Sequence, residues 1–150
     1  MELFTKHGIF TENEMRARHA IHLEAYNKHV AIEARTMLDM AQHQILPAAI
    51  HYSRALCDTV GTKRHVGASH RAESALIAQL SGHTDALYDT VEALSDVMNS
   101  VPRDAEQASL YYRTKVIPVM DQMRRHADVL EDLTDKNYWP YPTYSDLLFY

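Results

Sequence analysis

Residues 11–60 form one long stretch that contains no glycine and a single proline. Apolar residues recur in it three and four positions apart, as expected for a helix with one buried face. At about 1.5 Å per residue such a helix reaches roughly 75 Å, whereas the two later helices, of about 30 residues each, reach roughly 45 to 50 Å. The first helix is too long for its partners. Part of it must therefore be covered by something outside the bundle.

The composition favours helices throughout the chain. Only 4 Gly and 5 Pro interrupt the 150 residues, and 46% of the residues are hydrophobic against 23% charged. This balance allows one domain with a real core. The other residues are rich in Ala, Leu, Met, Glu, Gln and Arg, which lose little conformational freedom in a helix. The sequence therefore predicts an all-α protein.

The charge pattern and hydropathy argue against two classes of protein. The formal net charge is -5, and Lys and Arg are spread along the chain without the basic stripe that nucleic-acid binding requires. No apolar run approaches the roughly 18 residues of a membrane span, and the N-terminus lacks the apolar stretch of a signal peptide. We expect a cytoplasmic protein that binds neither nucleic acid nor membrane. The single Cys57 is expected to be a small buried hydrophobe, with a reactive thiol as the lesser alternative.

The first helix has a clear start and stop signal. Thr11 is followed three residues later by Glu14, the spacing of a capping box in which each side chain satisfies a backbone amide of the other. Gly61 is expected to end the helix, and residues 62–68 to reverse the chain. Pro102 suits the first turn of a third helix. Within one domain of residues 1–150, the expected segments are helices at 11–60, 69–98 and 103–135 and a tail at 137–150.

These segments predict an antiparallel three-helix bundle with an overlong, kinked first helix and an extended aromatic and proline-rich C-terminal tail. Counting residues places 101–103 beside 28–31, which brings Pro118 level with Pro47 and leaves residues 11–28 as an overhang. Two prolines at one level would let neighbouring helices bend together. The expected core residues are Met37, Met40, Ile45, Leu46, Pro47, Tyr52, Leu76, Leu80, Leu87, Leu94, Tyr112, Val116, Val119 and Met123.

The tail carries the only Trp together with four Tyr and one Phe, too much apolar area to leave in water. The favoured interpretation is a strap folded back over the bundle. The alternative is a tail that docks on a neighbouring subunit. Overhang and tail together give the expected interaction residues, which are Met15, Ile21, Leu23, Tyr26, Trp139, Tyr141, Leu147, Leu148 and Phe149.

The 10 His invite a metal assignment that the spacing does not support. His19 and His22, and likewise Asp39 and His43, share helix faces, but the chain has no Glu-x-x-His and no His-Glu-x-x-His. His29, His51 and His126 are the best candidates for buried hydrogen bonds. Glu33, Arg35 and Asp39 are expected to form structural ion pairs rather than a catalytic group. We predict no catalytic, cofactor-binding or metal-ligating residue in this chain.

Several segments of the chain match, in order, a known family. They are residues 8–18, 32–41, 45–48 and 138–149, the last ending in a WP-x-P-x-Y-x-x-LLF pattern. Together they resemble the C-terminal region of type III glutamine synthetases. The resemblance covers nearly the whole chain, and the ordered series is more specific than any single motif. His19 and His22 depart from the family pattern on the surface of the first helix, which puts a metal role for them in doubt.

The resemblance implies a function for the parent protein. Enzymes of this family are long bacterial proteins that ligate ammonia to glutamate with ATP and a divalent metal, Mg or Mn, and they assemble as double-ringed dodecamers. The chain would then be a fragment beginning after the catalytic region, with Met1 internal or added by cloning. The metal-binding carboxylates and nucleotide-binding strands would lie upstream, so no active-site residue carries over to this chain.

Three functions remain open at this point. The leading one is a noncatalytic helical domain that serves oligomer assembly, or packing on the catalytic domain, with that domain and neighbouring subunits as partners in a homo-oligomer. The alternative is a regulatory module that binds a small effector or an inhibitory protein between overhang and tail. The third is a stand-alone metal-binding bundle, which would need several His and carboxylates within about 2.0 to 2.2 Å of one ion.

Overall fold

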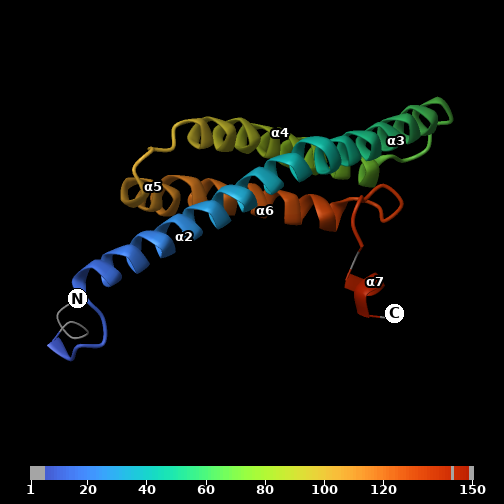
Figure 1. Cartoon of the computed structure of the whole chain (residues 1–150). Helices are drawn as coiled ribbons and strands as arrows, with labels where there is room; N and C mark the ends of the chain where they lie inside the picture. Colours follow the sequence, from blue (N-terminus) through green and yellow to red (C-terminus); the bar gives the residue numbers. More distant parts are fainter. Residues whose placement is uncertain (1–5, 143, 149–150) are drawn as a thin grey trace.

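A computed structural model describes residues 6–142 and 144–148 of the chain, and in these residues the only regular elements are helices (Figure 1). The prediction of an all-α protein is therefore confirmed for the described part. In chain order the elements are α2 (Glu12–Met40), the π-helical segment η1 (Ala41–Ile45), α3 (Leu46–His65), α4 (Arg71–Asn99), α5 (Ala105–Tyr111), the π-helical segment η2 (Tyr112–Val116), α6 (Ile117–Leu133) and α7 (Tyr144–Leu148).

The first three elements form one continuous helical rod that begins at the predicted cap. The Glu14 amide donates to Thr11 Oγ1 at 3.3 Å, and the Thr11 amide donates to Glu14 Oε2 at 2.8 Å, so the capping box is confirmed. The expected end at Gly61 is wrong, because α3 continues to His65. Gly67 makes the turn with φ of 70°, and the Ala68 amide donates to the Lys63 carbonyl at 2.9 Å. The left-handed conformation needed after the last helical residues is available only at Gly67.

Helix α4 runs back along this rod, and α5, η2 and α6 return in the original direction (Figure 1). The expected helices at 69–98 and 103–135 are observed at Arg71–Asn99 and Ala105–Leu133. Pro102 lies before the helix rather than in its first turn. Asp104 is the N-cap instead, because its Oδ1 accepts from the Gln107 amide at 2.9 Å and satisfies a donor that has no helical partner.

The core is built from three stripes of residues spaced seven apart. In α4, Leu80, Leu87 and Leu94 are each 0% exposed, while the other two rods contribute the stripes Ala34, Ala41, Ala48 and Val116, Met123, Leu130. Seven-residue spacing is typical of helices that cross at a shallow angle with side chains interlocked. Alanines on the first rod let its backbone approach the large leucines of α4 closely. The expected core residues Leu80, Leu87, Leu94, Val116 and Met123 therefore lie in the observed core.

Most of the expected core residues lie in or against this cluster. Ile45, Leu46, Tyr112, Val116 and Met123 are buried with the three leucines of α4, and Met37, Tyr52, Leu76 and Val119 pack half-buried against them. Met40 and Pro47 are half-buried. Cys57 is exposed, so the expectation of a buried thiol is wrong. Its apolar sequence neighbours point to other sides of α3, because successive helical residues lie about 100° apart.

A π-helical segment precedes each of the two internal prolines. Leu46 donates its amide to the Ala41 carbonyl, and Ile117 donates to the Tyr112 carbonyl, five residues back in both cases. Pro47 and Pro118 follow immediately. A proline ring collides with the carbonyl four residues earlier in a regular α-helix, and a wider turn relieves that collision. Each proline is thus accommodated by one extra residue in the preceding turn.

The relative register of the two parallel rods differs from the expected one. If Pro47 were level with Pro118, Ala41 would be level with Tyr112, but Ala41 shares a pocket wall with Met123, about three helical turns further along. These contacts do not place Pro47 and Pro118 at one level. The cause is the segment 100–104, which runs on past the end of α4 before α5 begins (Figure 1).

The C-terminal segment turns directly after α6. The amides of Tyr138 and Trp139 both donate to the Asp135 carbonyl, at 2.8 and 3.1 Å, and the Tyr138 ring lies 5.3 Å from the Tyr52 ring of α3. The extended path expected for the whole tail is wrong for residues 144–148, which form α7. Lys136 pairs with Asp146 and ties α7 to the end of the bundle.

Candidate functional site: a groove between α2 and α5 and a pocket beneath the tail

The expected interaction residues of α2 lie on two faces of that helix. Leu23 is half-buried and Tyr26 is 36% exposed, and both line a groove against α5. Met15 is half-buried one turn or more before them. Ile21, 64% exposed, is two residues from Leu23 and therefore lies on the opposite face. The structure thus brings Leu23 and Tyr26 together but leaves Ile21 apart from them.

The α2–α5 groove has a volume of about 670 Å³ and a mixed lining. Leu110 on its α5 side is 63% exposed and lines the groove together with Leu23 and Tyr26. His19 and Arg113 stand at the same groove. We did not predict Leu110 as an interaction residue. The signal in the sequence that could have identified it is an apolar residue between Ala108 and Tyr112, which are buried, at a position off their face of the helix.

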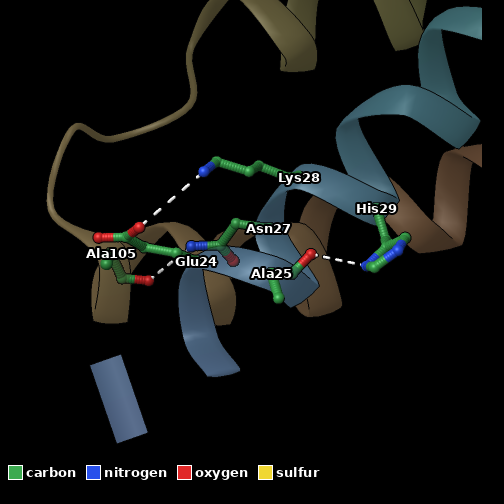
Figure 2. A network of polar contacts seen from close by, with 6 residues as sticks. All are labelled: Glu24, Ala25, Asn27, Lys28, His29 and Ala105. Atoms are coloured by element: carbon green, nitrogen blue, oxygen red, sulfur yellow. Dashed lines mark hydrogen bonds and ion pairs between the residues drawn. The ribbon is translucent and has the colours of Figure 1, made fainter. Parts of the chain in front are cut away.

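The groove is held in place by a hydrogen bond between α2 and the start of α5 (Figure 2). Asn27 Nδ2 donates to the Ala105 carbonyl at 2.8 Å. Beside it, Lys28 Nζ lies 4.0 Å from Glu24 Oε2, and His29 Nδ1 lies 2.8 Å from the Ala25 carbonyl (Figure 2). The overhang therefore ends before Leu23 rather than near residue 28. Its remaining part, at the N-terminal end of α2, extends beyond α5 (Figure 1).

The expected interaction residues of the tail divide between a buried and an exposed group. Trp139 is 9% exposed and belongs to the core cluster, with Tyr141 half-buried against it. Leu147 and Leu148 of α7 are 67% and 72% exposed. Phe149 lies outside the described residues. Trp139 and Tyr141 thus pack on the bundle, as expected of a strap, whereas the leucines of α7 are exposed.

A second cavity, the tail pocket, lies where the tail meets the bundle. It has a volume of about 420 Å³ and is lined mainly by apolar residues of α2, η1, α6 and the tail, including Trp139 and Tyr141. Trp139 Nε1 and the Tyr141 hydroxyl are both buried, and neither has a hydrogen-bond partner among the described residues. Burial raises the pKa of Tyr141, and the nearby charge of Asp39 raises it further. The tail pocket and the α2–α5 groove share no lining residue, and the start of α2 lies far from α7 in Figure 1, so overhang and tail do not form one groove.

The histidines are exposed except for His70, His83 and His126, which are half-buried. His83 of α4 and His126 of α6 face each other half-buried, with their Nδ1 atoms 3.2 Å apart. His29 and His51, expected to be buried, are exposed. His43 Nδ1 lies 2.9 Å from Asp39 Oδ1, in a hydrogen bond between two side chains on one helix face. Within residues 6–142 and 144–148, no three His, Cys, Asp or Glu side chains gather in a way that could hold a metal ion.

The comparisons with known proteins all point to glutamine synthetases. Residues 1–64 match the model of the glutamine synthetase C-terminal domain. The chain is 30% identical to the glutamine synthetase of Butyrivibrio fibrisolvens over 156 aligned positions, which cover 99% of this chain and 22% of that protein. The resemblance to the C-terminal region of type III glutamine synthetases is thereby confirmed. The type-3 glutamine synthetase of Dictyostelium discoideum is 26% identical over 99% of this chain and 21% of its own length.

A further relative is the glutamine synthetase of Bacteroides fragilis strain YCH46, 31% identical over 94% of this chain and 20% of that protein. The chain therefore spans about a fifth of the length of the glutamine synthetases it matches. The family match covers α2, η1 and nearly all of α3. Among the described helices, none combines the length and apolar character needed to span a membrane.

Proposed function

We propose that this chain is a noncatalytic C-terminal helical domain of a type III glutamine synthetase and that it serves assembly of the oligomer or packing on the catalytic domain. The observation that carries the proposal is the exposed apolar surface of the α2–α5 groove, where Leu110 is 63% and Tyr26 is 36% exposed. Apolar side chains surrounded by polar and charged residues are the composition typical of a protein–protein interface.

The groove is a rigid feature of the domain. Both of its walls are helices, and the Asn27 to Ala105 hydrogen bond fixes α2 against the start of α5. A fixed groove loses little conformational entropy when a partner binds, so its apolar area contributes efficiently to affinity. Beyond it, the start of α2 projects from the bundle and extends the surface that a partner can contact (Figure 1).

We infer the activity of the parent protein from its relatives, which are named glutamine synthetases. On this proposal the full-length protein ligates ammonia to glutamate with ATP and Mg or Mn, and its catalytic residues lie outside this chain. The partners of the domain are the catalytic domain of the same enzyme and neighbouring subunits in the cytoplasm. This chain alone should then show no ligase activity.

The groove can be tested with a double variant, Tyr26→Ser with Leu110→Ser. If the groove is an interface, the association constant of the chain, measured by sedimentation equilibrium, should fall at least tenfold while the far-UV circular dichroism stays unchanged. Ile50→Ser is the matched control, because Ile50 is 56% exposed on α3, away from the groove. Equal association of the double variant and the parent chain would reject the groove as the assembly surface.

A further inference from the structure

The tail pocket has the size of a small-molecule site and a largely apolar lining. Its volume of about 420 Å³ lies within the roughly 300 to 1,000 Å³ typical of ligand pockets. Met37 and Met40 of α2, Ile45 of η1 and Met123 of α6 contribute apolar side chains. Methionine side chains adapt their shape to an aromatic ring and make favourable sulfur–ring contacts. This part of the lining therefore suits the aromatic body of a ligand.

The charged part of the lining lies on α6 and is acidic. Among the described residues that line the pocket, the charged side chains are Arg124, Asp128 and Glu131. Arg124 Nε donates to Asp128 Oδ1 at 2.8 Å, so these two charges offset each other. Glu131 is half-buried and has no ion pair or hydrogen bond within the described part of the chain. The pocket is thus left with one uncompensated carboxylate.

This carboxylate favours a cationic ligand over a neutral or anionic one. Partial removal from water weakens the hydration of Glu131 and strengthens its attraction to a positive group. Negative potential also comes from α2, because the pKa of Tyr141 in the lining is raised by burial and further by the charge of Asp39. A carboxylate or phosphate ligand would therefore be repelled, and a neutral ligand would gain less from Glu131 than a cation.

The apolar and acidic parts of the lining are separated along α6. Glu131 follows Met123 by eight residues, which corresponds to about 12 Å of helix. Ala127 lies midway between them, and all three line the pocket. A ligand that contacts both parts is therefore elongated and carries its charge at one end.

We propose that the tail pocket binds a small organic cation with an aromatic body, whose ammonium group pairs with Glu131 and whose ring packs against the methionines of α2 and α6. The pocket shares no lining residue with the α2–α5 groove, so the proposal does not depend on the assembly function. A ligand here would hold the tail to α2 and α6, because all three contribute to the lining.

Three probes with one common body test the role of charge. 2-Phenylethylammonium, 2-phenylethanol and 3-phenylpropanoate share a phenylethyl group and end in a cation, a neutral hydroxyl and an anion, respectively. The chain has 7 Met, so ¹³C labelling of the methionine methyl groups gives a small set of reporters. The phenyl ring current should shift the signals of Met37, Met40 and Met123 saturably, while Met15 and Met98, which do not line the pocket, stay in place. The cation should bind most tightly and the anion most weakly.

Two variants and one control locate the effect at Glu131. Glu131→Gln removes the charge with little change in volume and should weaken binding of 2-phenylethylammonium by roughly three- to tenfold, with little change for 2-phenylethanol. Glu131→Lys should reverse the order, so that 3-phenylpropanoate binds most tightly. Glu33→Gln changes the net charge by the same amount at an exposed position of α2 outside the lining, and it should bind all three probes like the parent chain. Light scattering on the same samples separates ligand binding from association.

Several results would overturn the proposal. One is the absence of a saturable shift of the three pocket methionines up to the solubility limit of 2-phenylethylammonium. Another is equal affinity for the three probes, because the carboxylate would then play no part. A third is equal weakening by Glu131→Gln and Glu33→Gln, which would assign the effect to the net charge of the chain. If dilution without any probe shifts the same methyl signals in step with the mass, a second copy of the chain occupies the pocket instead.

Discussion

Replacement of Leu87 by Ala should reveal how strongly the central stripe holds the bundle together. Leu87 is 0% exposed and lies between Leu80 and Leu94, which are equally buried. Truncation removes the transfer free energy of the lost methyl groups and leaves a cavity, and for fully buried leucines the combined cost is about 2.7 to 5 kcal/mol. Helix α4 packs against both other rods. Side chains of one rod that moved into the cavity at position 87 would therefore lose contacts elsewhere in the core. We expect a loss of about 3 to 4 kcal/mol.

The assay is urea unfolding followed by circular dichroism, at a concentration below the range in which the chain associates. Leu110→Ala is the matched control. Because about two thirds of its side chain is already in water, we expect a loss of only about 0.5 to 1 kcal/mol. Leu87→Met keeps the volume and should cost less than about 1.5 kcal/mol. Equal losses for Leu87→Ala and Leu110→Ala would refute the assignment of the core.

Three further predictions concern the surface. Thr11→Ala removes the cap of α2 and should cost about 1 kcal/mol in the local stability of its first turns, measured by amide hydrogen exchange near Glu14; unchanged exchange there would count against the cap. The Lys63 ammonium donates to Glu73, and this bond together with a backbone hydrogen bond lowers the pKa of that carboxyl. Its contribution is therefore present above the pKa of the unfolded chain and is lost as the pH falls through the folded pKa, so Glu73→Gln should flatten the decline of stability in acid unfolding below about pH 4.5. Exposed Cys57 should react with a thiol reagent in the native state at a rate independent of global unfolding, and protection until unfolding would contradict its exposure.

The helices and the core could be predicted because their signals are local. The capping box needs only Thr11 and Glu14, and the buried stripes follow from the seven-residue spacing of residues such as Leu80 and Leu87. Helix α3 passes Gly61 because one glycine inside a helix costs only about 1 kcal/mol, which packing further along readily offsets. The positive φ of Gly67, which ends the helix, depends on the turn that follows.

The candidate sites depended on relations that the sequence does not contain. The path of residues 100–104 sets where α5 meets α2, and so decides that Leu110 lines the same groove as Leu23 and Tyr26. Trp139 could be expected to pack on the bundle, but its unpartnered Nε1 atom follows from the fold of the tail against α6. Long-range register and the satisfaction of individual polar atoms are properties of the assembled structure, so local patterns do not reveal them.

The most direct test of the assembly proposal is the mass of the chain in solution, measured by light scattering over a concentration series with and without excess chelator. An exposed groove that serves assembly should produce a dimer or larger oligomer that forms with increasing concentration and is insensitive to chelator. A strict monomer at every concentration would contradict self-assembly through this domain. Dissociation by chelator would instead assign the association to a bound metal.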